Sequence, residues 1–193
     1  MIGARGLGRR FGDRTVLAGV DVNLDRGGFL LVTGPNGSGK TTLLRLLAGL
    51  LAPTAGTLDV QAERGRIGFL GHEPLLYREL TALENLDLYG RLYRIPERRE
   101  RTGMLLERFG LWDTRGEPVS TFSRGMVQRL ALCRTLLHDP DLLLLDEPFS
   151  SLDAAGAELL QAELADRGAR TLVVASHQPG RISTQPTQRL ALV

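Results

Sequence analysis

The sequence predicts an α/β protein in which a parallel sheet is covered by helices. Three observations support this class. Short, wholly apolar runs recur along the chain, segments of helical periodicity follow them, and Gly, Pro, Asp and Ser separate the two kinds of segment. Continuous apolar runs suit strands that are buried on both faces, and strands alternating with helices form parallel sheets through right-handed crossovers.

The strands of this sheet are predicted at residues 29–32, 142–145 and 172–175. A first helix is expected before Pro53, with an inward face made of Leu43, Leu44, Leu47, Leu50 and Leu51. A second runs from Ser123 to about Asp139, with an inward face that includes Val127, Leu130, Ala131 and Leu137. A third begins at Asp153 and closes at Gly168, because glycine adopts the left-handed conformation that ends many helices.

Two further regions surround this core. Extended, turn-rich pieces at residues 16–17 and 20–24 predict an antiparallel β layer within the first sixty residues. Between Gly71 and Asp139, apolar residues recur at helical spacing and strand signals vanish, so we expect a helical subdomain at about residues 72–139. Residues 1–193, of which 42% are hydrophobic, are expected to form a single domain around one core.

Composition argues against several functions. The net charge is +2 and aromatic residues make up 5%, so no nucleic-acid partner is expected. Cys133 is the only cysteine, which excludes an internal disulfide and fits a reducing compartment. The first ten residues lack the apolar core of a signal peptide, and no apolar run approaches the roughly 18 residues of a membrane span. Any membrane role is therefore expected to depend on a partner.

The chain has one lysine, Lys40, among 24 basic residues, and arginine fills every other basic position. An ammonium group is compact enough to lie within a loop wrapped around phosphate, whereas a planar guanidinium is wider. The lysine belongs to a segment that we term the phosphate-binding loop, which consists of Gly34, Pro35, Asn36, Gly37, Ser38, Gly39, Lys40, Thr41 and Thr42.

The phosphate-binding loop follows a predicted buried strand and precedes a predicted helix, which is the context that phosphate binding requires. We expect all of its residues to contact a nucleotide, with backbone N–H groups and the helix terminus facing the phosphates. Lys40 is expected to reach the β- and γ-phosphates, and Thr41 to offer its hydroxyl to Mg²⁺. A tight glycine turn that binds nothing is the alternative.

Two carboxylates, Asp146 and Glu147, follow the predicted strand at residues 142–145. The carboxyl ends of strands are where α/β sheets bind their ligands. Asp146 can hold Mg²⁺ through water, and Glu147 can polarise the water that attacks the γ-phosphate, unless the pair merely caps the next turn. These motifs suit kinases, GTPases and ATPases, but guanine recognition usually needs a second lysine, which the chain lacks.

Residues 122–129, Phe-Ser-Arg-Gly-Met-Val-Gln-Arg, place Ser123 and Gly125 at the start of the second predicted helix. A serine there presents a hydroxyl and free N–H groups to an anion, although it can also be only a cap. In this order along the chain, the segment resembles the signature helix of ATP-binding cassette (ABC) ATPases, whose general pattern is Leu-Ser-Gly-Gly-Gln. We term residues 122–129 the signature segment, and the resemblance covers residues 11–177.

The resemblance implies roles for further residues. It implies that Phe11 stacks on adenine, that Asp153 lies in a dimer-facing loop and that His177 senses the γ-phosphate. Taken singly, they can be a core aromatic, a helix cap and a loop histidine. It also implies a head-to-tail homodimer, in which each ATP lies between the phosphate-binding loop of one copy and Ser123 and Gly125 of the other.

The chain departs from the family pattern at three positions. Arg124 and Met126 replace the first Gly and the Gln of the signature, which leaves Ser123 and Gly125. His72 follows residues 67–71, Ile-Gly-Phe-Leu-Gly, where the family usually has a strand and then a glutamine that touches Mg²⁺ and couples nucleotide state to the helical subdomain. His72 is therefore expected near the metal as a neutral acceptor or a polar hinge, or else as a solvent-facing loop residue.

Gly71-His72, the pattern that follows it to Leu86, and the signature segment together look like the ATP-binding subunit of the haem exporter used in c-type cytochrome maturation. That resemblance implies separate integral-membrane permease subunits, a peripheral position on the cytoplasmic face of the inner membrane, and ATP turnover that drives release of haem-loaded chaperone. An ABC transporter for another substrate and a soluble, non-transport ABC module are the alternatives, because a fold does not name its cargo.

Arginines are dense after Leu86, at positions 91, 94, 98, 99 and 101. They can meet acidic lipid or the cytoplasmic loops of a partner. A solvated helical face is the simpler interpretation.

Overall fold

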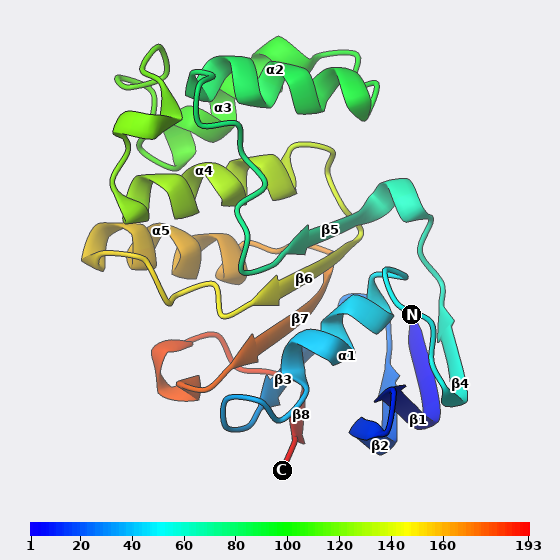
Figure 1. The fold of residues 1–193 in the computed structure, drawn as a ribbon. Helices are drawn as coiled ribbons and strands as arrows, with labels where there is room; N and C mark the ends of the chain where they lie inside the picture. The colour runs from blue at the N-terminus through cyan, green and yellow to red at the C-terminus, as the bar shows by residue number, and fades with distance from the viewer.

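The computed structural model describes all residues from Met1 to Val193. A five-stranded parallel sheet forms its centre (Figure 1), with the strand order β5-β6-β7-β3-β8. These strands are β5 (Ile67–Leu70), β6 (Leu142–Asp146), β7 (Thr171–Ser176), β3 (Phe29–Thr33) and β8 (Gln188–Ala191). The predicted α/β class and the three predicted strands are therefore correct, whereas β8 was not anticipated.

Alternation of side chains along the central strands divides the buried residues into two clusters. Leu143 and Leu145 of β6 face one cluster, which lies under α2 to α5, while Leu142 and Leu144 face the other. Each central strand buries apolar side chains on both sides of the sheet, which explains its uninterrupted apolar sequence. Figure 1 shows α2, α3, α4 and α5 on one side of the sheet and α1 on the other.

The helices are α1 (Lys40–Leu47), α2 (Ala82–Leu92), α3 (Arg98–Arg108), α4 (Arg124–Leu136) and α5 (Ala154–Ala165). Short 3₁₀ turns occur at Arg64–Arg66, Val119–Thr121 and Pro179–Arg181. Residues 71–141 contain α2, α3 and α4 and no strand, in agreement with the helical character expected there. The third predicted helix, α5, ends three residues before Gly168.

Helix α1 is shorter than expected because Gly49 ends it. Gly49 adopts a left-handed backbone (φ 69°), and its N–H donates to Leu46 O at 3.0 Å while the N–H of Leu50 donates to Arg45 O at 2.9 Å. This pair of hydrogen bonds is the Schellman motif, which closes a helix at a glycine. Leu50 and Leu51 therefore lie beyond the helix, and the expectation that they extend its inward face is wrong.

A second, antiparallel sheet has the order β2-β1-β4 and contains the predicted β layer. It comprises β1 (Ile2–Phe11), β2 (Arg14–Leu24) and β4 (Ala55–Val60). The central strand β1 was not predicted, since its alternating Gly and Arg residues have low strand propensity. Ile2, Ala4 and Leu7 are nevertheless buried against α1, so tertiary packing decides its conformation.

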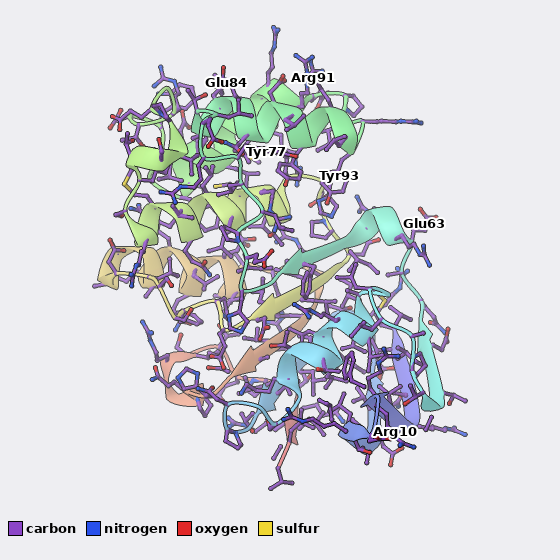
Figure 2. The ribbon with its side chains drawn as sticks, viewed as in Figure 1. Arg10, Glu63, Tyr77, Glu84, Arg91 and Tyr93 are labelled. Carbon is purple, nitrogen blue, oxygen red and sulfur yellow. The ribbon has the colours of Figure 1, made fainter.

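Three of the five arginines between residues 91 and 101 are paired within the protein. Arg91 and Arg98 both bind Asp87, and Arg101 binds Asp139, at N–O distances of 2.8, 2.7 and 3.1 Å. Arg91 projects outwards from α2 (Figure 2). These ion pairs favour a solvated, internally paired face over a lipid-binding one. The protein has no helix that combines the length and apolarity of a membrane span.

Candidate active site

One cavity of about 360 Å³ brings together the phosphate-binding loop and the acidic residues that follow β6. It is lined by Val16, Asn36, Gly37, Gly39, Lys40, Thr41, Thr42, His72, Asp146 and Glu147. The phosphate-binding loop, His72 and the acidic pair thus converge where β3, β5 and β6 end, as predicted for the carboxyl ends of parallel strands, and Val16 of β2 adds to the lining.

The phosphate-binding loop leads directly into α1. Gly39 occupies the N-cap position with a left-handed backbone (φ 98°) and supplies no side-chain cap. A Cβ atom at Gly39 would lie 2.6 Å from Leu17 Cδ2, so a larger residue would clash with β2. The N–H groups of the first turn are therefore free of a side-chain cap, which suits binding of an anion at this helix terminus.

The ammonium of Lys40 lies inside the loop. Its Nζ donates to Gly34 O at 2.8 Å and to Pro35 O at 3.0 Å, and it lies 3.6 Å from Glu147 Oε1. The residue is only 6% exposed. A buried charge is stable only when oxygen atoms surround it, and here two carbonyls and a carboxylate do so. The same charge can bind phosphate oxygens in the adjoining cavity.

Thr41, Asp146 and His72 form the second group in the cavity. The hydroxyl of Thr41 donates to Asp146 Oδ2 at 2.6 Å, and His72 Nε2 lies 3.8 Å from the same oxygen. The other carboxylate oxygen, Asp146 Oδ1, is buried without a hydrogen-bond partner. The structure has no cluster of three or more His, Cys, Asp or Glu side chains suited to a metal. This donor set fits Mg²⁺, which takes few protein ligands and completes its shell with water and phosphate.

Glu147 begins the turn after β6 with a left-handed backbone (φ 49°), and its N–H donates to Ala175 O on β7 at 2.9 Å. His177 follows β7 and holds the carboxylate. Its Nδ1 lies 2.8 Å from Glu147 Oε2, and its backbone N–H donates to Oε1 at 2.9 Å. The neighbouring strands β6 and β7 therefore bring together Glu147 and His177, two of the three predicted catalytic side chains, and the third, Lys40, lies 3.6 Å from Glu147 Oε1.

Seven predicted nucleotide contacts are not among the residues that line this cavity: Gly34, Pro35 and Ser38 of the phosphate-binding loop, and Phe11, Ser123, Gly125 and Asp153. Ser123 caps α4 by accepting a hydrogen bond from Met126 N at 3.2 Å, and Asp153 caps α5 by accepting one from Gly156 N at 2.8 Å. A Cβ at Gly125 would lie 3.7 Å from Asp153 Oδ2, so the two helix starts are neighbours. Both helices begin on the left of Figure 1, away from the phosphate-binding loop. Within one chain Ser123, Gly125 and Asp153 do not meet the phosphate-binding loop.

Phe11 ends β1 and also lies outside the residues that line the cavity. It faces Arg14 across the β1–β2 turn, and Val16, two residues further along β2, lines the cavity. The Phe11 side chain is 45% exposed, so it is not the core aromatic that was the alternative. Phe11 therefore lies at the turn that precedes Val16, with part of its ring open to solvent.

Asn85 organises the loop that follows His72, and sequence reasoning missed it. This fully buried side chain (0% exposed) donates to Tyr77 O at 2.9 Å and Thr81 O at 3.0 Å and accepts from Tyr77 N at 2.8 Å. Tyr77 lies beside α2 in Figure 2. A polar residue on the buried face of a predicted helix is the signal that could have identified it.

Gln128 and Arg181 hold the turn after Glu147, and neither was predicted. Gln128 Nε2 donates to Pro148 O at 3.2 Å, which connects α4 to this turn. Arg181 donates to Phe149 O at 2.7 Å from the segment after His177. The adjacent carbonyls of Pro148 and Phe149 are thus held by side chains from two different segments, which fixes the backbone that follows Glu147.

Comparisons with known proteins match this arrangement. Residues 17–150 match the family model described as ABC transporter. The chain is 40% identical to the daunorubicin resistance ATP-binding protein DrrA3 of Streptomyces coeruleorubidus, over 97% of this chain and 63% of that protein. It is 37% identical to the ABC transporter ATP-binding protein NatA of Bacillus subtilis, over 88% of this chain and 76% of that protein. It thus spans less than two thirds of DrrA3.

A further relative is the cytochrome c biogenesis ATP-binding export protein CcmA of Cupriavidus necator, which is 38% identical over 92% of this chain and 83% of that protein. Among solved structures, the dimeric ABC transporter cassette MJ0796 superposes with a TM-score of 0.84 at 28% identity, over 100% of this chain and 94% of that one. Its dimeric post-hydrolysis state, bound to ADP and Pi, gives a TM-score of 0.81 at 28% identity, over 94% and 90%.

Proposed function

This chain belongs to the ABC transporter family of ATP-hydrolysing cassettes and has their P-loop fold, and from this premise we propose that it is the ATP-binding and hydrolysing subunit of a membrane transport complex. The observation that carries the proposal is the single cavity in which Lys40, Thr41, Asp146 and Glu147 meet. The proposal assigns each of these side chains a separate part in phosphoryl transfer to water.

Nucleotide binding uses the residues of the phosphate-binding loop. The N–H groups of the loop and of the first turn of α1 receive phosphate oxygens, and the ammonium of Lys40 neutralises the β- and γ-phosphates. Phe11 receives the adenine at the rim of the cavity. Thr41 and Asp146, with His72 beside them, would hold Mg²⁺, which when bound neutralises charge that develops on the phosphate oxygens.

Hydrolysis requires a water molecule aligned with the γ-phosphate. Glu147 orients and deprotonates this water, because its carboxylate is fixed by His177 and lies beside the lysine that binds the γ-phosphate. His177 keeps the carboxylate in position and senses the γ-phosphate. General-base assistance of this type contributes about 10²–10⁴-fold to a rate.

A second copy of the chain completes the site. Ser123 and Gly125 lie away from the phosphate-binding loop of their own chain, on a surface that they share with Asp153. In a head-to-tail homodimer they contact the γ-phosphate bound by the other copy, and Asp153 lies at the interface. The dimeric state of the related cassette MJ0796 supports this arrangement. ATP then acts as a ligand of the closed dimer, and hydrolysis releases it.

For the cargo, we propose haem export, or release of a haem-loaded chaperone, in c-type cytochrome maturation. Similarity to CcmA and the Gly71-His72 pattern support this choice. The chain would then dock peripherally against integral-membrane permease subunits at the cytoplasmic face of the inner membrane. Relatives of similar identity named for daunorubicin resistance and for import of aliphatic sulfonates support another substrate as the second candidate.

Replacement of Glu147 tests the ATPase assignment. Glu147→Gln should retain ATP binding, trap an ATP-bound dimer and lower turnover at least about 100-fold. Glu158→Gln, an exposed change on α5, is the matched control and should hydrolyse ATP at the parental rate. Parental turnover in Glu147→Gln would refute the role of Glu147.

Deletion of the gene tests the cargo separately. Staining for covalently bound haem should reveal loss of c-type cytochromes in the deletion strain. Recovery of the stain with the parental gene, but not with the Glu147→Gln gene, is expected. Normal cytochromes in the deletion strain would exclude haem-linked transport and leave transport of another substrate.

A further inference from the structure

A cationic side chain covers part of the Phe11 ring. The guanidinium carbon of Arg9 lies 4.5 Å from the centre of that ring. The same guanidinium donates from Nη1 to Ala52 O at 2.8 Å, and its Nε is buried without a hydrogen-bond partner. Arg9 is thus fixed at one end by a backbone carbonyl while its flat face stacks on the aromatic ring.

The backbone anchor of Arg9 and the nucleotide cavity lie on opposite sides of β1. β1 lies between β2 and β4, and Ala52 belongs to the loop that enters β4. Val16, which lines the cavity, lies on β2. The guanidinium of Arg9 is therefore anchored on the β4 side of β1, whereas Val16 of the cavity lies on the β2 side.

We propose that Arg9 is a positioning residue for the base of the nucleotide, a role that rests on the proposed contact between Phe11 and adenine. The guanidinium holds one face of the ring and leaves the opposite face open for a planar base. An exposed aromatic ring at the end of a strand has free rotamers, and fixing them beforehand lowers the entropy that is lost on binding. Arg9 thereby favours ligands that carry a base over bare polyphosphate.

Binding measurements on the full chain, with Mg²⁺ present, separate this role from phosphate binding. The probes are ATP and inorganic tripolyphosphate, which has the three phosphates but no base. Arg9→Gln should weaken ATP binding about two- to fivefold, as expected for loss of an exposed cation–π contact, and leave tripolyphosphate affinity unchanged. Arg10→Gln is the matched control, because Arg10 is the exposed neighbour on β1 (Figure 2) and should alter neither affinity.

Two further variants make each outcome decisive. Phe11→Ala should weaken ATP binding and spare tripolyphosphate; if it has no effect, the adenine contact in the proposed function is wrong. If Phe11→Ala weakens ATP binding and Arg9→Gln does not, only the role of Arg9 is refuted. Arg9→Lys keeps the charge without the flat stacking surface and should fall between the parent and Arg9→Gln. If Arg9→Gln binds neither probe, Arg9→Lys decides: equal weakening for both probes would overturn the proposal.

Discussion

His177 holds the Glu147 carboxylate at both oxygens, through its imidazole Nδ1 at 2.8 Å and its backbone N–H at 2.9 Å. The two residues follow adjacent parallel strands, so the pairing of β6 with β7 sets their separation. A base held from two sides loses little entropy when it orients a water molecule.

Removal of the imidazole should impair hydrolysis without abolishing the base. His177→Ala keeps the backbone N–H contact to Glu147, so we expect kcat to fall less than in Glu147→Gln while ATP affinity is retained. Because the two side chains act together, the double variant should be scarcely slower than Glu147→Gln alone. Steady-state kinetics of the four proteins measure this, and additive losses would argue against a shared role.

Asp146→Asn should raise the Mg²⁺ concentration needed for half-maximal ATPase activity by at least about tenfold. The substitution removes the charge that faces Thr41 and the unpartnered oxygen available to the metal. Magnesium titrations at saturating ATP measure the shift. Asp113→Asn, on an exposed loop, is the control. An unchanged magnesium requirement in Asp146→Asn would remove this residue from the metal site.

His72 is 65% exposed yet lies 3.8 Å from Asp146, and two replacements test what it contributes. If a neutral acceptor is sufficient, His72→Gln should keep ATPase activity close to the parent while His72→Ala lowers it severalfold. Measured against magnesium concentration, the loss in His72→Ala should diminish as magnesium rises. Equal activity in all three proteins would make His72 a solvent-facing loop residue.

Asn85→Ala should destabilise the fold by about 1–3 kcal/mol, because it removes a fully buried side chain that pairs with the N–H of Tyr77 and with several carbonyls. Denaturant unfolding measures the change. Asn23→Ala, at an exposed position on β2, provides the control and should alter stability little. A similar loss in both variants would show that Asn85 is not a special anchor of the loop after His72.

His138 should make stability depend on pH. Burial lowers the pKa of its imidazole from the ordinary value of 6.5, and the charges of Arg134, Arg66 and Arg101 act in the same direction against an opposing hydrogen bond with Ile67 O. The unfolded chain therefore binds this proton first as pH falls. The contribution of His138 to stability is full above about pH 6.5. It decreases as pH falls from there towards the lower pKa of the folded state.

Replacement of His138 tests that dependence. In His138→Gln the loss of melting temperature between pH 7 and pH 5 should be smaller than in the parent. His72→Gln, which changes an exposed histidine, should keep the parental slope. Thermal unfolding at several pH values measures both, and identical slopes in all three proteins would contradict the assignment.

The side chains that carry the chemistry of the site could be predicted from the sequence more fully than the residues that hold the surrounding backbone in place. Lys40, Asp146 and Glu147 lie in short motifs next to apolar strands, and local sequence alone places such motifs at strand ends. Asn85 and Gln128 act through backbone carbonyls of other segments, and no local pattern specifies those contacts.

The same limit applies to the fold. Residues 142–145 predict a buried strand because their apolar run is uninterrupted. β1 depends instead on pairing with β4 more than forty residues away, and β8 on pairing with β3 at the opposite end of the chain. Strand propensity at Gly3, Gly6 and Gly8 is too weak to reveal such distant pairing.

The solitary lysine gives this protein a chemical handle. Among the side chains of residues 1–193, an acylating reagent directed at amines has one target, the ε-amino group of Lys40, because all other basic side chains apart from histidine are guanidinium groups. The peptide that contains Lys40 therefore reports occupancy of a single loop, and mass spectrometry of that peptide can follow filling and emptying of the loop without an engineered label.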